Sequence, residues 1–321
     1  MLWTPLVSIL CAFVAHSLAL TFRGSDLSSL VVVENQGVHF TDNGSQQPFE
    51  RILVNHGSNA ARIRVWTAGQ YDTSYALNLA KRQAIPSGWP TTLSGLNTQV
   101  YTYTQSLVQQ FANQGTPIDI LQVGNEINNG LLWPVGQISV NGINPVSQLL
   151  HSAINGAKSA GSPRILIHLA NGWDWSGLSS FFKGVFIPGA LATSDIDIIG
   201  VSFYPFYDAG ATLSALKSSL TNLANTYGKP IVVAETDWPV SCSGVQLTEP
   251  SIPVSTSGQE TWITDIKNVL TSLPNGLGQG IFYWEPGWVG SANLGSACAD
   301  NLLVTSSGAT RTSINIFQDM Q

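Results

Sequence analysis

Two glutamates follow apolar runs in the sequence and could act as a chemical pair. Glu126 ends the stretch ILQVGNE, and Glu235 ends a second run, VVAE. An unpaired carboxylate is costly to bury, so each must reach solvent, find partners or do chemistry. Hydrolysis of a glycosidic bond needs two carboxyl groups: one protonates the leaving oxygen, and the other attacks the anomeric carbon or activates water. The pair predicts a glycoside hydrolase in which Glu126, held half-desolvated, is the acid.

Further polar side chains follow the same apolar runs and could serve these two carboxyl groups. Asn125 could donate its amide to a sugar 2-hydroxyl. Tyr204 could orient the nucleophile, and an arginine could keep it ionised. The alternatives are a structural ion pair for the arginines and core packing for the tyrosine, with its hydroxyl satisfied. The residues predicted to bind substrate are Arg62, Arg64, Asn125, Asn171, Tyr204 and Trp284.

Other chemistries receive less support from the sequence. His168 is interpreted as a hydrogen-bonded strand residue, and Glu285 is either a site residue or a solvated loop residue. No spacing of His, Asp and Glu predicts a metal site, and no cofactor is expected. No G-x-S-x-G follows a strand, which argues against a serine triad.

The pattern of elements predicts a parallel α/β fold. Near-continuous apolar runs are typical of strands covered on both faces, and they alternate with amphipathic helices. One helix is expected with a core stripe of Val100, Tyr103, Leu107 and Phe111, and a capping box is expected to start another at Ser257. The predicted strands are 20–24, 61–66, 119–123, 164–169, 197–203, 230–234 and 280–284.

Polar residues gather at the carboxyl ends of these runs, as in a (β/α)8 TIM barrel. A doubly wound sheet would also bind ligand at that edge, but no G-x-G-x-x-G follows the first strand. The sequence therefore favours the barrel.

Composition narrows the class of partner. The 321 residues are 44% hydrophobic and 10% charged, with a net charge of −6. An acidic chain lacks the basic face that a nucleic-acid partner needs. Ten Trp and eight Tyr suit a neutral ligand with apolar faces, such as a sugar. We expect a polysaccharide substrate, no nucleic-acid or membrane partner, and a monomer.

The first residues predict secretion. Residues 1–18 are interpreted as a signal peptide because the apolar run from Leu6 to Val14 is too short to span a bilayer. The remaining residues, 19–321, are expected to form one catalytic domain. Cys242 and Cys298 then remain as a pair in an oxidising compartment, which predicts a disulfide, with two buried free thiols as the alternative. Asn43 lies in an N-x-S sequon and is a predicted glycosylation site.

Several longer motifs carry a resemblance to a known family. The tracts GLLWP, HLANGWDW and SFYPFY, together with RIRVW, VVAETDWP, FYWEPGW and NLGSACADN, resemble the fungal endo-β-1,4-galactanases of glycoside hydrolase family 53. The resemblance implies a retaining mechanism, with Glu126 as acid/base and Glu235 as nucleophile, acting on the β-1,4-galactan of type I arabinogalactan in pectin. Bacterial relatives carry a structural calcium, but no acidic loop here requires one. Other retaining endo-glycanases, such as mannanases or cellulases, share only the two glutamates.

The chain departs from the family between roughly Arg82 and Pro86. The family has a third strand there, ending in a D-F-H-Y-S-D type motif that supplies a histidine and an aspartate to the sugar site. We interpret the clean join as a truncated gene model or a mis-spliced transcript, which sequencing across the codons of 80–90 would test. The alternative to an active galactanase is therefore a non-catalytic or crippled galactan-binding chain in a barrel without strand 3.

Overall fold

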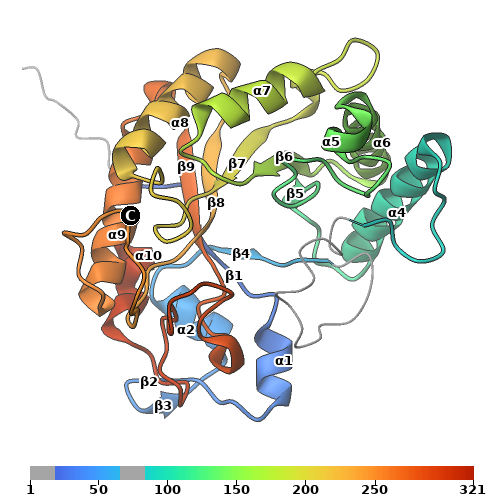
Figure 1. Ribbon diagram of the computed structural model, residues 1–321. Coiled ribbons are helices and arrows are strands. Elements are labelled where there is room, and N and C mark those ends of the chain that lie inside the picture. Colours follow the sequence, from blue (N-terminus) through green and yellow to red (C-terminus); the bar gives the residue numbers. More distant parts are fainter. Residues whose placement is uncertain (1–18, 66–83) are drawn as a thin grey trace, which may run out of the picture.

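The computed structural model describes residues 19–65 and 84–321, and its central feature is a curled sheet of seven parallel strands (Figure 1). Every neighbouring pair in this sheet is parallel. The strands are β1 Phe22–Asp26, β4 Ala60–Arg62, β5 Ile120–Gln122, β6 Arg164–Leu169, β7 Ile198–Ser202, β8 Ile231–Thr236 and β9 Gly278–Tyr283. Each of the seven predicted strands is confirmed, with ends shifted by up to three residues among the described residues; Trp66, the predicted end of the second strand, lies outside them.

Helices lie outside the sheet and connect successive strands (Figure 1). The predicted signal peptide, residues 1–18, lies outside the described residues. A short hairpin, β2 Thr41–Asp42 and β3 Ser45–Gln46, carries the predicted glycosylation site Asn43 in its exposed turn. The helices are α1 Leu30–Asn35, α2 Phe49–Asn55, α4 Leu93–Asn113, α5 Ile138–Asn141, α6 Asn144–Ala160, α7 Trp175–Val185, α8 Leu213–Tyr227, α9 Thr256–Thr271 and α10 Ile316–Asp319.

The order of the strands shows where the barrel is open. The order is β4-β1-β9-β8-β7-β6-β5, so the first and last strands of the chain's series are neighbours, as in a closed barrel. Within residues 19–65 and 84–321, however, no strand joins β4 to β5. We call this gap between the edge strands β4 and β5 the seam. It lies where the sequence predicts the loss of strand 3. The fold is therefore a (β/α)8-type barrel with one strand missing.

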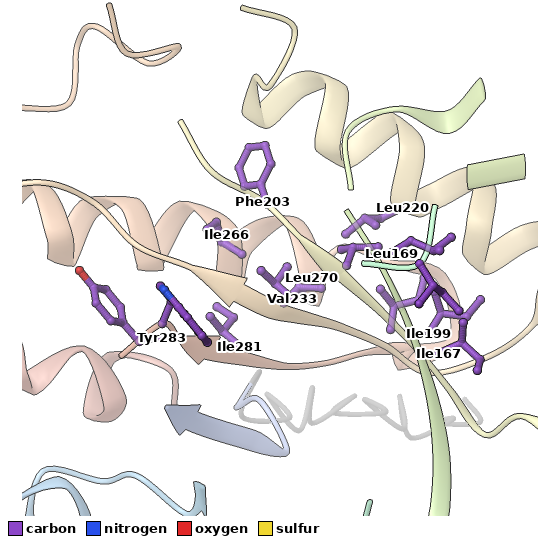
Figure 2. Packing of buried hydrophobic residues seen from close by; sticks show 14 of the residues in the cluster. Ile167, Leu169, Ile199, Phe203, Leu220, Val233, Ile266, Leu270, Ile281 and Tyr283 are labelled. Atoms are coloured by element: carbon purple, nitrogen blue, oxygen red, sulfur yellow. The ribbon is translucent and has the colours of Figure 1, made fainter. Parts of the chain in front are cut away.

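The core has two layers, which follow from the alternation of side chains along each strand. Inside the barrel lies a small buried cluster formed by Leu166, Ile198, Val232 and Ala234. The opposite side of the strands packs on the helices, where Ile167, Ile199, Val233 and Ile281 meet Leu220, Ile266 and Leu270 (Figure 2).

Two details of the helices differ from the sequence prediction. In α4 the buried side chains are Leu96, Val100, Thr104 and Val108, so only Val100 of the predicted stripe is buried. The prediction was wrong because α4 packs mainly on α6, and this partner decides which face is covered.

The expected capping box at Ser257 is also wrong. Helix α9 begins two residues earlier, where the Ser255 hydroxyl accepts a hydrogen bond from the Gly258 amide at 3.1 Å.

The predicted disulfide is confirmed. Cys242 and Cys298 are bonded and join the loop after β8 to the loop after β9, across a sequence separation of 56 residues. Both loops begin at the carboxyl ends of their strands, so the disulfide restrains the end of the barrel that carries the polar residues.

Candidate active site

Glu126 lies in the tight turn that follows β5. Gly124 has φ 78°, and a Cβ on it would lie 2.6 Å from the Ile127 side chain, so only glycine fits there. Glu126 itself has φ 51°, an uncommon value for a residue other than glycine that often marks functional sites. Its Oε1 accepts a hydrogen bond from the Ser202 hydroxyl at 2.6 Å. Burial, and next the neighbouring Glu235 carboxylate, raise the pKa of Glu126, while Ser202, Arg64 and Arg62 oppose this rise.

Glu235 lies near the end of β8, where the register with β7 shifts by one residue. The residue is 4% exposed, and its carboxyl group contacts two guanidinium groups and one phenol. Arg64 donates to Oε1, Arg62 Nη2 lies 2.9 Å from the same oxygen, and the Tyr204 hydroxyl donates to Oε2 at 3.1 Å. Burial acts to raise the pKa of Glu235, but Arg64 and Arg62 outweigh it and lower the pKa to about 2. The group is therefore a carboxylate over the whole working range of a protein.

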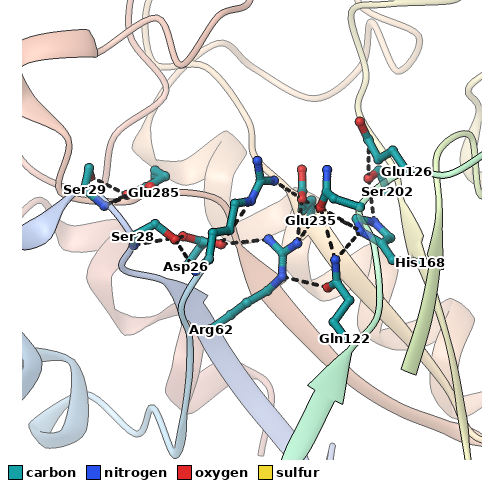
Figure 3. A network of polar contacts seen from close by, with 12 residues as sticks. Asp26, Ser28, Ser29, Arg62, Gln122, Glu126, His168, Ser202, Glu235 and Glu285 are labelled. Carbon is teal, nitrogen blue, oxygen red and sulfur yellow. Dashed lines mark hydrogen bonds and ion pairs between the residues drawn. The ribbon is translucent and has the colours of Figure 1, made fainter. Parts of the chain in front are cut away.

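The two arginines are held in place by one residue at the end of β1 and by one that follows β9. Figure 3 shows the first of these, Asp26, beside Arg62. Arg62 Nη1 donates to Asp26 Oδ2 at 2.7 Å, and Asp26 is fully buried at the end of β1. The Arg64 guanidinium lies 4.0 Å from the centroid of the Trp284 ring, a cation–π contact. Trp284 is only 4% exposed, so the structure places it beside the arginine; its contact with substrate stays a prediction.

His168 is fully buried on β6 and links the two carboxyl groups. Its Nε2 lies 2.9 Å from Ser202 Oγ, and its Nδ1 lies 3.9 Å from Glu235 Oε1. Burial lowers the pKa of His168 to about 3, so the ring is neutral. The interpretation of His168 as a hydrogen-bonded strand residue is confirmed.

Asn125 lies between the arginine and the histidine. Its Oδ1 accepts from Arg62 Nη2 at 2.7 Å and from Gln122 Nε2 at 3.1 Å. Its carbonyl oxygen is therefore used inside the protein, and the amide NH2 is the group that could meet a sugar hydroxyl. Asn171, by contrast, is exposed in the loop after β6 with φ 60°, and its binding role stays a prediction.

Glu285 is not a solvated loop residue. It is 2% exposed and has φ 44°, and its carboxyl oxygens accept from the Ser29 amide at 3.1 and 3.2 Å. Burial and the nearby Asp26 raise the pKa of Glu285 to about 8. Glu285 therefore keeps its proton to a higher pH than an ordinary glutamate does.

The sequence prediction missed three buried or half-buried residues of this cluster: Asp26, Gln122 and Ser202. Gln122 and Ser202 interrupt the apolar runs ILQV and IIGVSF, and a polar residue at an inward position of such a run was the signal that could have identified them. Asp26 lies two residues beyond the predicted end of the first strand.

Among the described residues, no group of three or more His, Cys, Asp or Glu side chains is arranged to hold a metal ion. No helix in the same ranges is long and apolar enough to cross a membrane.

One carboxyl group with a raised pKa and one with a lowered pKa, at the carboxyl ends of strands in a (β/α)8-type barrel, are the pair that a glycoside hydrolase needs. The family model for glycosyl hydrolase family 53 matches residues 22–81 and 72–317. The chain belongs to this family. The two matched segments overlap at residues 72–81, just before the point where the sequence predicts the loss of a strand.

Curated relatives cover almost the whole chain. The chain is 44% identical to a protein of Neosartorya fischeri named probable arabinogalactan endo-beta-1,4-galactanase A, over 99% of this chain and 98% of the relative. It is also 44% identical to the arabinogalactan endo-beta-1,4-galactanase A of Emericella nidulans, over 95% of this chain and 96% of the relative. The first alignment spans 357 positions, more than the 321 residues here, so it contains gaps in this chain.

A solved structure, described as one of two fungal beta-1,4-galactanases, superimposes with a TM-score of 0.86 at 42% identity and covers 94% of this chain and 99% of its own. The barrel therefore keeps the arrangement of its relatives on both sides of the seam.

Proposed function

We propose that the chain is a secreted, monomeric endo-β-1,4-galactanase that hydrolyses the galactan of type I arabinogalactan with retention of configuration. The observation that carries the proposal is that one cluster raises the pKa of Glu126 and lowers the pKa of Glu235. The names of the relatives support the substrate. The disulfide supports secretion, since such bonds persist in oxidising compartments.

In the first step, the Glu235 carboxylate attacks the anomeric carbon while Glu126 gives its proton to the leaving oxygen. The bond between that carbon and oxygen breaks, and a covalent glycosyl–enzyme forms. In the second step, Glu126, now a carboxylate, takes a proton from water as the water displaces Glu235. The Tyr204 hydroxyl and both guanidinium groups hold Glu235 in place before and after the attack.

The experiment is release of reducing ends from purified β-1,4-galactan, beside mannan, cellulose and xylan, by the folded chain. We expect turnover on galactan and less than a hundredth of it on the other polymers. Turnover confined to another polymer would contradict the substrate. Binding of galactan by a folded chain without turnover would favour the alternative, a galactan-binding chain.

Arg64→Met is expected to move the acid limb of the pH profile of kcat/KM upward by at least about one pH unit. The reason is that an opposite charge at contact distance lowers a carboxyl pKa by about 1–3 units, and the variant removes that charge from Glu235. The same contact stabilises the folded chain fully above pH 4.5, the ordinary pKa of glutamate, and this contribution is lost as the pH falls toward 2. Arg51→Met, on the exposed face of α2, is the matched control. An acid limb that stays in place in Arg64→Met would contradict the role of the arginine.

A further inference from the structure

Inward side chains of three successive strands form a line of hydrogen bonds that ends on Glu126 (Figure 3). Gln122 of β5 lies with its amide nitrogen 3.2 Å from His168 Nδ1 on β6. His168 Nε2 lies 2.9 Å from Ser202 Oγ on β7, and Ser202 Oγ lies 2.6 Å from Glu126 Oε1. His168 is 0% exposed and Ser202 2% exposed, so neither exchanges these partners for bulk water.

Counting hydrogens gives this line a direction. A serine hydroxyl has one hydrogen, and Ser202 donates it to Glu126 Oε1. The hydrogen in the bond between His168 and Ser202 must then come from the ring. The neutral imidazole therefore carries its hydrogen on Nε2 and donates it to Ser202 Oγ. Nδ1 is left as an acceptor, and the Gln122 amide is the donor within reach. Each donor therefore points along the line toward Glu126.

A competing arrangement places the ring hydrogen on Nδ1, from which it would reach Asn125 Oδ1 at 3.1 Å. That oxygen already accepts from Arg62 Nη2 at 2.7 Å. The Gln122 amide has two hydrogens and three acceptors within reach: the Gly124 carbonyl at 2.8 Å, Asn125 Oδ1 at 3.1 Å and His168 Nδ1 at 3.2 Å.

With the ring hydrogen on Nε2, Gln122 can donate to Gly124 and to Nδ1, and Ser202 keeps its hydrogen for Glu126. With the ring hydrogen on Nδ1, the bare Nε2 and a deprotonated Glu126 compete for the single Ser202 hydrogen.

We propose that Ser202 and His168 are positioning residues for the acid/base glutamate: their directed hydrogen-bond chain holds Oε1 of Glu126 and so fixes the orientation of the carboxyl group that transfers the proton. This inference rests on the proposed function. In the first step, the carboxyl O–H bond of Glu126 breaks and the proton goes to the leaving oxygen. In the second step, water returns a proton to the same carboxyl group. No proton travels along the chain, and Ser202 donates to Oε1 throughout.

The charges around Glu126 agree with this role. Burial and Glu235 raise its pKa, whereas the Ser202 hydrogen bond, Arg64 and Arg62 lower it. Tyr204, whose own pKa is raised well above 10 by burial, remains neutral. His168 is neutral as well, so Ser202 supplies the hydrogen bond that favours the carboxylate form needed in the second step.

The direction of the chain can be read without any activity. Nitrogen-15 NMR of the full chain, with labelled histidine rings and with His168→Gln to assign the signal, distinguishes the two neutral tautomers. We expect the Nε2–H tautomer at a pH above the pKa of Glu126, where the Glu126 carboxylate takes the Ser202 hydrogen. The Nδ1–H tautomer would overturn the proposal.

The effect on Glu126 is tested with Ser202→Ala. The pKa of Glu126 is expected to rise by about one unit, since a hydrogen bond to a charged group is lost. Carbon-13 NMR of the Glu126 carboxyl group would show this shift, and the basic limb of kcat/KM would move upward equally. Ser219→Ala, which removes a buried hydroxyl from α8, is the matched control and should change neither.

An unchanged Glu126 titration in Ser202→Ala would overturn the proposal even if the variant is less active. A folded wild type that shows the expected tautomer and titration but releases no reducing ends would contradict the proposed function alone.

Discussion

Glu235→Gln is expected to lose galactan hydrolysis by a factor on the order of 10⁴ or more. The amide that replaces the carboxylate is a poor nucleophile and cannot form the glycosyl ester. The variant also leaves Arg62 and Arg64 without the anion that both now contact. Initial rates of reducing-end release at saturating galactan would measure the loss. Glu34→Gln, an exposed glutamate of α1, should keep wild-type rates.

Trapping the intermediate makes this result specific to the nucleophile. A 2-deoxy-2-fluoro galactobioside with a good leaving group should label the wild type once, and mass spectrometry should place the label on Glu235. A label on another residue, or a variant within tenfold of the wild type, would show that Glu235 is not the nucleophile. A folded wild type that neither turns over nor takes the label would support the binding-only alternative.

Filling the seam between β4 and β5 should stabilise the fold. Each buried backbone group left without a partner costs about 1–3 kcal/mol, and a strand placed in the seam would pair with both edges. It would also cover part of Ile63 and Val65, which are 62% and 46% exposed beside the seam. Insertion of the segment of the Emericella nidulans relative that aligns with the gap is expected to raise the free energy of unfolding by about 3–6 kcal/mol. The melting temperature should rise by roughly 5–10 °C.

Calorimetry and urea unfolding of the two chains would measure this difference. A glycine- and serine-rich insertion of the same length at the same place is the control, because it lengthens the loop without supplying a strand. Equal stability of the strand-bearing chain and this control would show that the seam is already satisfied in the shorter chain.

The catalytic end of the barrel could be predicted because strand ends leave a clear pattern. Glu126, Glu235, Arg62 and Arg64 follow apolar runs, and parallel strands bring such positions to one edge. The structure brings these four and Tyr204 together. Asn171 was chosen on the same pattern, but its turn leaves it exposed.

The supporting residues are harder to predict, for a physical reason. Ser202 and Gln122 belong to strands whose other residues are apolar, and their importance depends on which side chains face the barrel interior. A helix face raises the same difficulty: in α4, the packing of α6 rather than the most apolar stripe decided which residues are buried. The role of Ser202 and Gln122 and the buried face of α4 both depend on contacts with residues distant in sequence. A local sequence pattern carries no information on such contacts.

Arg62 connects the two edges of the open sheet. From β4 its Nε donates to Gln122 on β5 at 3.0 Å, while its other nitrogens contact Asp26, Asn125 and Glu235. Where an active site is strained, replacing one of its residues can lower activity and raise stability. Arg62 should behave differently, because its removal takes one cation away from the buried carboxylates of Asp26 and Glu235 and breaks the hydrogen bond that links the edge strands. Selection for thermal stability should therefore retain Arg62 as strongly as selection for catalytic activity does.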